Sequence, residues 1–282
     1  MTVSTYFQPT SVPEALALLG EHGPDLLVMA GGTVAMQRIN EGTALPRLVM
    51  GLRRAGLDGI ERTGDTLRIG AMTTLTALAD QAHAPLLATA ACRTGSWAIR
   101  NMATVGGNLF TPSPGGDVGT ALLALDAAVV VTGRQGTRSI PLKAFWTGFM
   151  ATDIRADELV TAVTVQLTPG RDTFLKLGRR EANTPAVVMV AAHVEEADER
   201  VGSARVALGA VGPHPLRAPS VEAALAGAPL TKETITKAAA TAVDDVVPFT
   251  DAIATDWYRR RMVGVIVERA LTGVAAQAGG NA

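Results

Sequence analysis

Residues 103–109 read Ala-Thr-Val-Gly-Gly-Asn-Leu, and residues 112–117 behind them read Pro-Ser-Pro-Gly-Gly-Asp. Adjacent glycines lack a Cβ, so the backbone can adopt positive φ angles and approach a ligand closely. Short hydrogen-bonding side chains are present at Thr104, Asn108 and Ser113. Backbone N–H groups in such a stretch form a concave anion site that suits a phosphate. A single glycine pair is also typical of an ordinary turn, so this stretch alone leaves both interpretations open.

Another glycine pair, earlier in the chain, follows a short apolar run. Residues 26–30 (Leu-Leu-Val-Met-Ala) predict a buried strand, residues 31–33 (Gly-Gly-Thr) follow directly, and residues 34–40 have helical spacing. A strand that passes through glycines into a helix directs free N–H groups and the positive end of the helix dipole at an anion. Two such stretches suit a pyrophosphate that bridges two half-sites. Neither stretch matches a P-loop or begins a Rossmann fingerprint.

Other motifs occur in order around the two glycine pairs. Residues 99–101 (Ile-Arg-Asn) run into Thr104–Leu109, and residues 113–117 (Ser-Pro-Gly-Gly-Asp) follow. With Ala30-Gly31-Gly32-Thr33, these motifs resemble the FAD-binding medium subunit of the molybdenum hydroxylases. That family includes the xanthine, aldehyde, carbon monoxide and N-heterocycle dehydrogenases. Further segments of the chain that match it are 9–16, 69–74, 157–160, 174–176, 179–180, 258–259 and 269–271.

The resemblance implies a PCMH-type FAD-binding fold of the α+β class. It consists of two N-terminal α/β subdomains and a C-terminal antiparallel sheet with helices. The expected units are residues 1–55, 56–168 and 169–282. The cofactor would extend between the first two units, and the third would cover the isoalloxazine face. The mixed order of hairpins and helices in the chain independently favours α+β over a doubly wound sheet.

Local patterns predict the individual elements. Ser11 and Glu14 form a capping-box pattern, and Gly23-Pro24 ends the helix that they begin. The crossover from residues 26–30 to a strand near 48–50 favours parallel pairing. Residues 60–62 and 66–70 flank a turn and predict a hairpin. Helices are also expected around 75–81, 85–96, 118–125, 220–226, 232–242 and 256–272, and strands at 128–132, 159–167, 173–178, 186–194 and 205–209.

The resemblance also implies which residues bind the cofactor. The glycine stretch at residues 31–33, the first along the chain, and the second, at residues 104–108, would hold the pyrophosphate from opposite sides. Asp117 would bind ribose, while Leu159 and Lys176 would lie near the flavin or its ribityl chain. From the residues alone, Asp117 could equally cap the helix that begins near residue 118. The full expected set is Met29, Ala30, Gly31, Gly32, Thr33, Val34, Thr104, Val105, Gly106, Gly107, Asn108, Asp117, Leu159 and Lys176.

The sequence departs from the commoner family pattern at two positions. Val34 stands where many members have Asp, Ser or Asn, which removes a side-chain contact, and Gly115 stands where Ala is usual. The carbon monoxide type tends to have His in place of Thr33 and Asp in place of Asn108. The sequence therefore favours the other branches, with an N-heterocycle or an aldehyde as the substrate.

Composition excludes several other classes of protein. The net charge of −1 means that the chain lacks the excess of positive charge that is typical of proteins that bind nucleic acid or an anionic membrane. The single cysteine excludes a disulfide framework and a cysteine-ligated cluster within the chain. The four histidines are scattered, so no metal site or catalytic residue is expected. Arg259-Arg260-Arg261 is expected on a solvated helix face, and the tryptophans as core or interface anchors.

The N-terminus lacks the basic and apolar segments that are typical of a signal peptide. No apolar run approaches the roughly 20 residues of a membrane span. The expected location is therefore the reduced cytoplasm. Hydrophobic residues make up 48% of the chain and the mean hydropathy is +0.24, which favours a surface that a partner covers. An Ala-rich monomer would give the same values.

The resemblance implies a division of labour among three chains. A large subunit with a molybdenum cofactor would hydroxylate the substrate, and two iron–sulfur clusters on a small subunit would carry electrons to FAD on this chain. An external acceptor would then oxidise the flavin, in a dimer of heterotrimers. Two alternatives remain open: a stand-alone FAD oxidoreductase of the same fold, and a scaffold protein whose glycine pairs are only turns.

Overall fold

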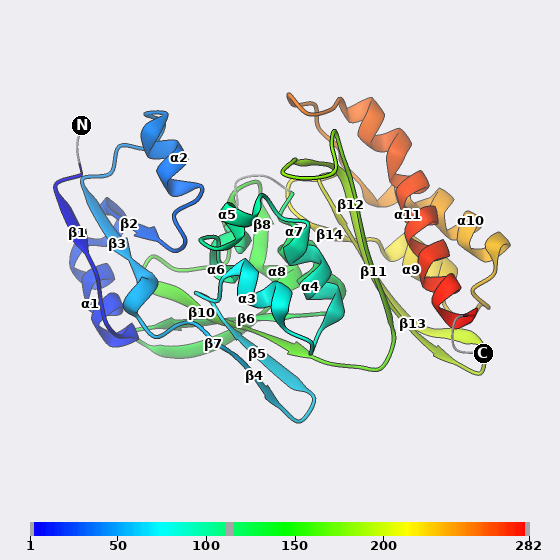
Figure 1. The fold of residues 1–282 in the computed structure, drawn as a ribbon, viewed down its shortest axis with the longest axis horizontal. Helices are drawn as coiled ribbons and strands as arrows, with labels where there is room; N and C mark the ends of the chain where they lie inside the picture. Colours follow the sequence, from blue (N-terminus) through cyan, green and yellow to red (C-terminus); the bar gives the residue numbers. More distant parts are fainter. Residues whose placement is uncertain (1–2, 111–114, 280–282) are drawn as a thin grey trace.

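The computed structural model describes residues 3–110 and 115–279. In these residues, three larger sheets follow one another along the long axis of the molecule, and the N- and C-termini lie at opposite ends (Figure 1). The N-terminal sheet has three strands, the middle sheet five and the C-terminal sheet four. No helix within the described ranges has the length and apolar character needed to cross a bilayer.

The N-terminal sheet is parallel, with the order β1 (Thr5–Phe7), β3 (Leu48–Gly51), β2 (Leu26–Met29). The predicted crossover through α2 (Ala35–Asn40) is confirmed. Helix α1 (Val12–His22) begins at Ser11, whose hydroxyl accepts a hydrogen bond from Glu14 N. The Glu14 carboxylate reaches back to Thr10 N at 2.7 Å, which completes the capping pattern one residue earlier than expected. Short 3-10 turns follow α1 and β3, at Gly23–Asp25 and Leu52–Arg54.

The middle sheet is antiparallel, with the order β4-β5-β10-β6-β7. The predicted hairpin 60–70 is confirmed as β4 and β5. Strand β7 was not expected, because a single one of its residues (Ile140) is buried and the apolar alternation is absent. The strands are β4 (Ile60–Thr63), β5 (Thr66–Gly70), β6 (Ala128–Gly133), β7 (Gly136–Pro141) and β10 (Glu158–Gln166), and a small hairpin adds β8 (Trp146–Gly148) and β9 (Ala151–Thr152).

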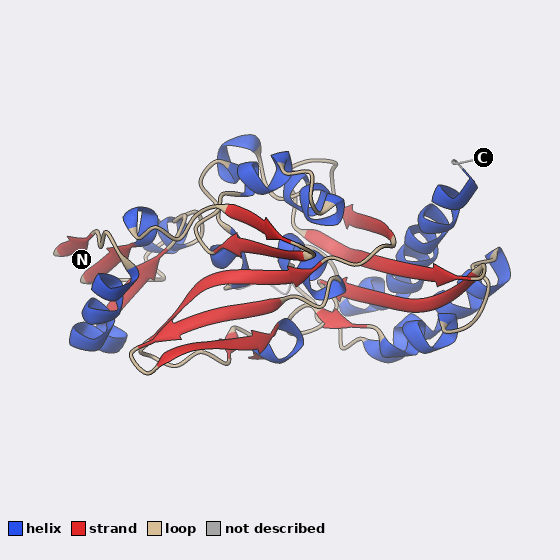
Figure 2. Cartoon of the chain, turned by 90° about the horizontal axis from the view of Figure 1, so that it is seen from below, coloured by secondary structure: helices blue, strands red, loops and turns tan. Residues whose placement is uncertain are grey.

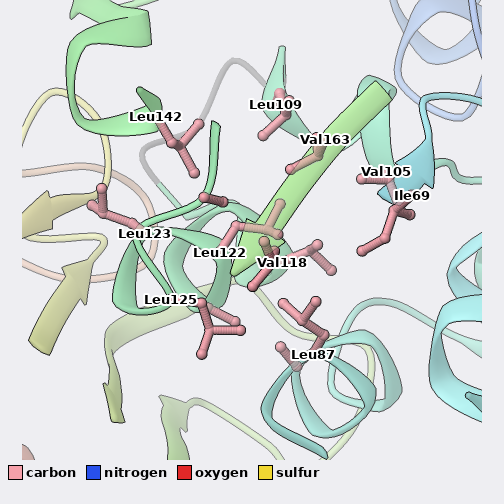
Figure 3. Close-up of a cluster of buried hydrophobic side chains, with 14 of the residues drawn as sticks. Ile69, Leu87, Val105, Leu109, Val118, Leu122, Leu123, Leu125, Leu142 and Val163 are labelled. Atoms are coloured by element: carbon pink, nitrogen blue, oxygen red, sulfur yellow. The ribbon is translucent and has the colours of Figure 1, made fainter. Parts of the chain in front are cut away.

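Short helices cover one face of the middle sheet, and the most buried of them is α7 (Asp117–Ala124) (Figure 1). Every residue of α7 is buried. Figure 3 shows its Val118 and Leu122 between Leu87 and Val163, which come from α4 and β10. The same core contains Met189 of the C-terminal sheet. The other helices here are α3 (Leu75–Asp80), α4 (Pro85–Cys92), α5 (Trp97–Arg100), α6 (Val105–Leu109) and α8 (Leu142–Phe145).

The C-terminal sheet is antiparallel and runs in the order β11-β12-β13-β14. One of its faces carries α9, α10 and α11, and its long strands are visible from below in Figure 2. Each predicted strand and helix of this region is present, with longer strands than expected. The elements are β11 (Arg171–Gly178), β12 (Ala186–Ala197), β13 (Arg200–Gly209), β14 (Leu216–Arg217), α9 (Pro219–Leu225), α10 (Lys232–Thr241), the 3-10 turn Ala242–Asp245 and α11 (Asp256–Gly279).

Arg259, in the first turn of α11, corrects one expectation. Arg260 and Arg261 are exposed as predicted, but the Arg259 side chain is 1% exposed. Its Nη1 donates to Val187 O at 2.7 Å and Ala210 O at 2.8 Å, and its Nη2 donates to Asp251 Oδ1 at 2.6 Å. The helix begins over the ends of β12 and β13, where these carbonyls need a donor. The sequence Arg-Arg-Arg alone does not indicate that its first residue is buried.

Candidate functional site

A cleft of about 700 Å³ lies between the N-terminal and middle sheets and is bordered by the C-terminal sheet. Its volume is in the range of small-molecule and cofactor sites. Of the expected residues, twelve line this cleft, drawn from all three sheets or the segments that connect them. These are Ala30, Gly31, Gly32, Thr33, Val34, Thr104, Gly106, Gly107, Asn108, Asp117, Leu159 and Lys176.

Met29 and Val105 do not line the cleft. The Val105 side chain is fully buried in the core of the middle unit, and its N–H donates to Thr73 O at 3.0 Å. Met29 packs beneath the first glycine pair, since a Cβ on Gly32 would lie 3.3 Å from the Met29 sulfur. Both residues therefore support the shape of the site from behind.

The first glycine stretch has the open backbone that its sequence predicts. Gly32 has a φ of 76°, which a residue with a side chain rarely adopts. The backbone N–H groups of Gly31, Gly32 and Thr33 donate no hydrogen bond to another described residue. These N–H groups border the cleft, so this stretch can bind an anion.

The second glycine stretch is a short helix, not an open loop. Helix α6 is capped by Thr104, whose Oγ1 accepts from Gly107 N at 3.1 Å. Neither glycine has a positive φ, and Gly106 N donates to Ala71 O at 2.8 Å. The expectation of free N–H groups here is wrong, because the cap and the neighbouring chain use them. A Cβ on Gly106 would lie 2.9 Å from that same carbonyl, so close packing requires the glycine.

The two glycine stretches touch each other across the cleft. A Cβ on Gly31 would lie 1.9 Å from Met102 O, and a Cβ on Gly107 would lie 3.5 Å from the Ala30 Cβ. These stretches were expected to form one site, and the structure places them side by side. Ser113 and Pro114, also expected nearby, lie outside the described residues.

Asp117 faces the cleft from the first turn of α7. It does not cap the helix, because the cap residue is Gly116. Its side chain is 6% exposed, and Lys176 Nζ of β11 lies 2.7 Å from Oδ1. Oδ1 is buried, and among the described residues this ion pair is its contact with a cation, without a hydrogen bond of regular geometry. Lys176 also donates to Arg93 O at 3.2 Å, which ties the C-terminal sheet to the middle unit.

Burial raises the pKa of Asp117 from 3.8 to about 6, against the opposing effect of Lys176. A carboxyl group whose pKa is higher in the folded chain than in the unfolded chain stabilises the fold while it is protonated. That contribution is lost as the pH rises through the folded pKa. Without flavin, we expect the free energy of unfolding to fall by about 2 kcal/mol between pH 4 and pH 7 from this group.

The measurement is urea unfolding of the chain and of Asp117→Asn over this pH range. The variant removes the titration but keeps the shape of the side chain. The difference between the two stabilities should decline as the pH rises from 4 to 7. A difference that stays constant would contradict the assignment.

Several cleft residues were missed by the sequence analysis. The residues that line it are Arg38 of α2, Thr94 and Gly95 after α4, Ile154, Arg155, Ala156 and Glu158 before and at the start of β10, and Asn183, Thr184 and Pro185 after β11. Most come from irregular connections, where neither apolar periodicity nor a motif marks a residue. Asn183, at a φ of 48°, is a turn residue, and Asn-Thr-Pro was a sequence signal for that turn.

Known proteins share this fold and this sequence pattern. Residues 2–166 match the family described as "FAD binding domain in molybdopterin dehydrogenase", and residues 173–274 match "CO dehydrogenase flavoprotein C-terminal domain". The chain is 31% identical to the carbon monoxide dehydrogenase medium chain of Hydrogenophaga pseudoflava, over 96% of this chain and 97% of that one. It is also 31% identical to the nicotinate dehydrogenase FAD-subunit of Eubacterium barkeri, over 98% and 97%.

Solved structures of related proteins have the same fold as this chain. A carbon monoxide dehydrogenase chain from Hydrogenophaga pseudoflava matches with a TM-score of 0.93 at 32% identity, covering 98% of each chain. Quinoline 2-oxidoreductase from Pseudomonas putida 86 matches with a TM-score of 0.91 at 26% identity, covering 99% of each chain. The expected fold is confirmed. The equal identities to the carbon monoxide and nicotinate relatives do not separate the branches of the family.

Proposed function

This chain belongs to the family of FAD-binding domains in molybdopterin dehydrogenases, and from this premise we propose that the cleft between its sheets is the FAD site. The chain is an FAD-dependent oxidoreductase subunit, similar along its length to proteins named medium chain or FAD subunit. The single observation that carries the proposal is the contact of the two glycine stretches at a cleft of cofactor size.

The residues present fit this cofactor. The free N–H groups of residues 31–33 would hold the pyrophosphate, since they are the unpaired donors of the cradle. Thr104 to Asn108 would close the opposite side by packing, because the N–H groups of Val105 to Asn108 are paired. Asp117 has a buried oxygen without a hydrogen bond, which would accept one from a sugar hydroxyl.

The chain contributes binding and orientation. Bound FAD would supply the redox chemistry, accepting electrons from one partner and giving them to another. Leu159 and Ile154 add apolar wall to the cleft, which limits access of water. Lys176 keeps β11 against Asp117 and so holds the C-terminal sheet over the site.

We also propose the partners and the assembly. A large molybdenum-cofactor subunit and a small iron–sulfur subunit would complete a heterotrimer that pairs into a dimer of heterotrimers in the cytoplasm. Trp97 and Trp257 are 70% and 65% exposed, and such surfaces are often covered by a partner. The electrons would come from an N-heterocycle or an aldehyde that the large subunit oxidises. The mass of the co-expressed complex tests the assembly.

The division into units 1–55, 56–168 and 169–282 is part of the proposal. Each unit contributes its own sheet, and the two family matches meet between residues 166 and 173. The stand-alone oxidoreductase remains the second candidate in principle, but no described side chain near the cleft favours it.

An absorption spectrum of the purified chain tests the site. We expect non-covalent FAD, released by acid and identified by its mass. Gly107→Val should bind FAD at least about tenfold more weakly, because its side chain would crowd Thr104 and Ala30. Gly202→Val is the control, because a Cβ at this position of β13 meets nothing closer than 3.7 Å. A colourless chain that takes up no added FAD would contradict the proposal.

A further inference from the structure

One wall of the cleft is formed by a single continuous segment. Every residue from 154 to 160 except Asp157 lines the cleft. The segment leaves the small hairpin β8–β9 and enters β10 at Glu158. Residues Glu158 to Val160 pair with β6, whereas residues 154–157 lie outside any strand, so strand pairing fixes only the later part of the segment. The wall therefore needs support from elsewhere.

Arg138 of β7 provides this support, although it does not line the cleft itself. Its Nε and Nη2 donate to the two oxygens of Glu158 at 2.8 and 2.9 Å. The same guanidinium donates to Asp153 Oδ2 at 3.0 Å and to Asp153 O at 2.8 Å. Glu158 also accepts from Arg155 N at 2.8 Å. One side chain thus binds both ends of the segment 153–158, and its planar fork is suited to this geometry.

Gly133 allows the contact between Glu158 and Arg138. Strand β6 lies between β10 and β7, and Gly133 of β6 pairs with Glu158 of β10. A Cβ on Gly133 would lie 2.9 Å from the Glu158 Cγ. The absence of a side chain at Gly133 therefore lets Glu158 cross over β6 to reach Arg138.

We propose that Arg138 is a positioning residue for the cofactor: with Glu158 and Asp153 it clamps the segment 154–160 into the shape of the cleft wall. The inference rests on the proposed FAD site and names a residue that does not touch the cofactor. Its effect on binding passes through Ile154, Arg155 and Leu159, which do line the cleft.

The clamp is stable over the physiological pH range. Hydrogen bonds from Arg138 lower the pKa of Glu158 from 4.5 to about 2, despite the opposing effect of burial. The pKa of Arg138 is raised by its hydrogen bonds to Glu158 and Asp153. Since the Glu158 pKa is lower in the folded chain, its contribution to stability is complete above pH 4.5 and is lost as the pH falls through about 2. Both partners are therefore charged wherever flavin binding is measured.

Flavin titration of the purified full-length chain and four variants tests the clamp. Arg138→Gln breaks the clamp by removing the guanidinium that binds Glu158 and Asp153. Gly133→Ala breaks it by placing a methyl group against the Glu158 side chain. Both should bind FAD about tenfold more weakly and alter the circular dichroism of the flavin that remains bound. Arg138→Lys should recover part of the affinity, because an ammonium keeps one charge-assisted bond but not the fork. Arg62→Gln is the control. It removes an exposed ion pair on β4, at the other edge of the sheet, in which Arg62 Nη2 lies 3.6 Å from Asp65 Oδ1, and it should leave FAD binding unchanged.

The outcomes separate the inference from the function that it rests on. If Arg138→Gln does not fold, Gly133→Ala decides, because it keeps all charges. Folded variants with wild-type FAD affinity and an unaltered flavin spectrum would overturn the clamp and leave the FAD site intact. A wild-type chain that binds no FAD would overturn the proposed function itself.

Discussion

Alanine at position 31 is expected to weaken flavin binding by about 10- to 100-fold, the largest effect of any single methyl group in the site. Its Cβ would lie 1.9 Å from Met102 O and 3.0 Å from Ala103 Cα. Both neighbours are backbone atoms, so no rotation of a side chain relieves the overlap. The two glycine stretches must move apart, and the free N–H groups of residues 31–33 move with them.

Flavin titration of Gly31→Ala measures this effect, and Gly202→Ala is the matched control. The control adds the same methyl group where the nearest atom is 3.7 Å away, and we expect wild-type affinity. Equal affinities for both variants would show that the contact between the stretches does not set the shape of the site.

Replacement of Arg259 by methionine is expected to destabilise the chain by about 3–5 kcal/mol, because each buried carbonyl left without its donor costs about 1–3 kcal/mol. Three strand-end carbonyls would lose their donor: those of Ala186, Val187 and Ala210. The contact of the guanidinium with the Phe249 ring, 4.6 Å from its centre, would be lost as well. Most domains are stable by only about 5–15 kcal/mol, so the variant should unfold at a much lower urea concentration.

Arg260→Met is the control, because it removes the same charge one position along the same helix from an exposed side chain. We expect a change within about 0.5 kcal/mol. A loss of less than 1 kcal/mol in Arg259→Met, by urea unfolding, would show that water or other donors satisfy these carbonyls.

The sequence predicted those parts of the fold that have a local cause. The capping box at Ser11, the crossover after Leu26 and the hairpin 60–70 each depend on residues close in the chain. The family resemblance predicted that the two glycine stretches hold one pyrophosphate from opposite sides. The close approach of Gly31 to Met102 O was not predicted, because no local pattern contains it. The assignment of cofactor roles to these residues remains a prediction that the flavin titrations test.

The elements that the sequence did not predict depend on contacts with distant residues. Strand β7 is an edge strand with one buried residue, so its sequence carries no apolar period. Helix α6 needs a cap from Thr104 and close packing on Ala71, and the glycines in its sequence favour a turn instead. The clamp at Arg138 joins residues 20 positions apart, and Arg259 reaches carbonyls 49 to 73 positions away.

The burial of α7 has a consequence for how the chain acquires its structure. The helix packs on the middle sheet and on β12 and β13, so one core spans the junction between the two family matches. A fragment restricted to the second match would leave Met189, Ala191 and Ala207 facing water. During synthesis, the middle unit therefore cannot complete its core until residue 210 has left the ribosome. The two halves match separate family models, but they share one hydrophobic core, so we expect them to unfold together.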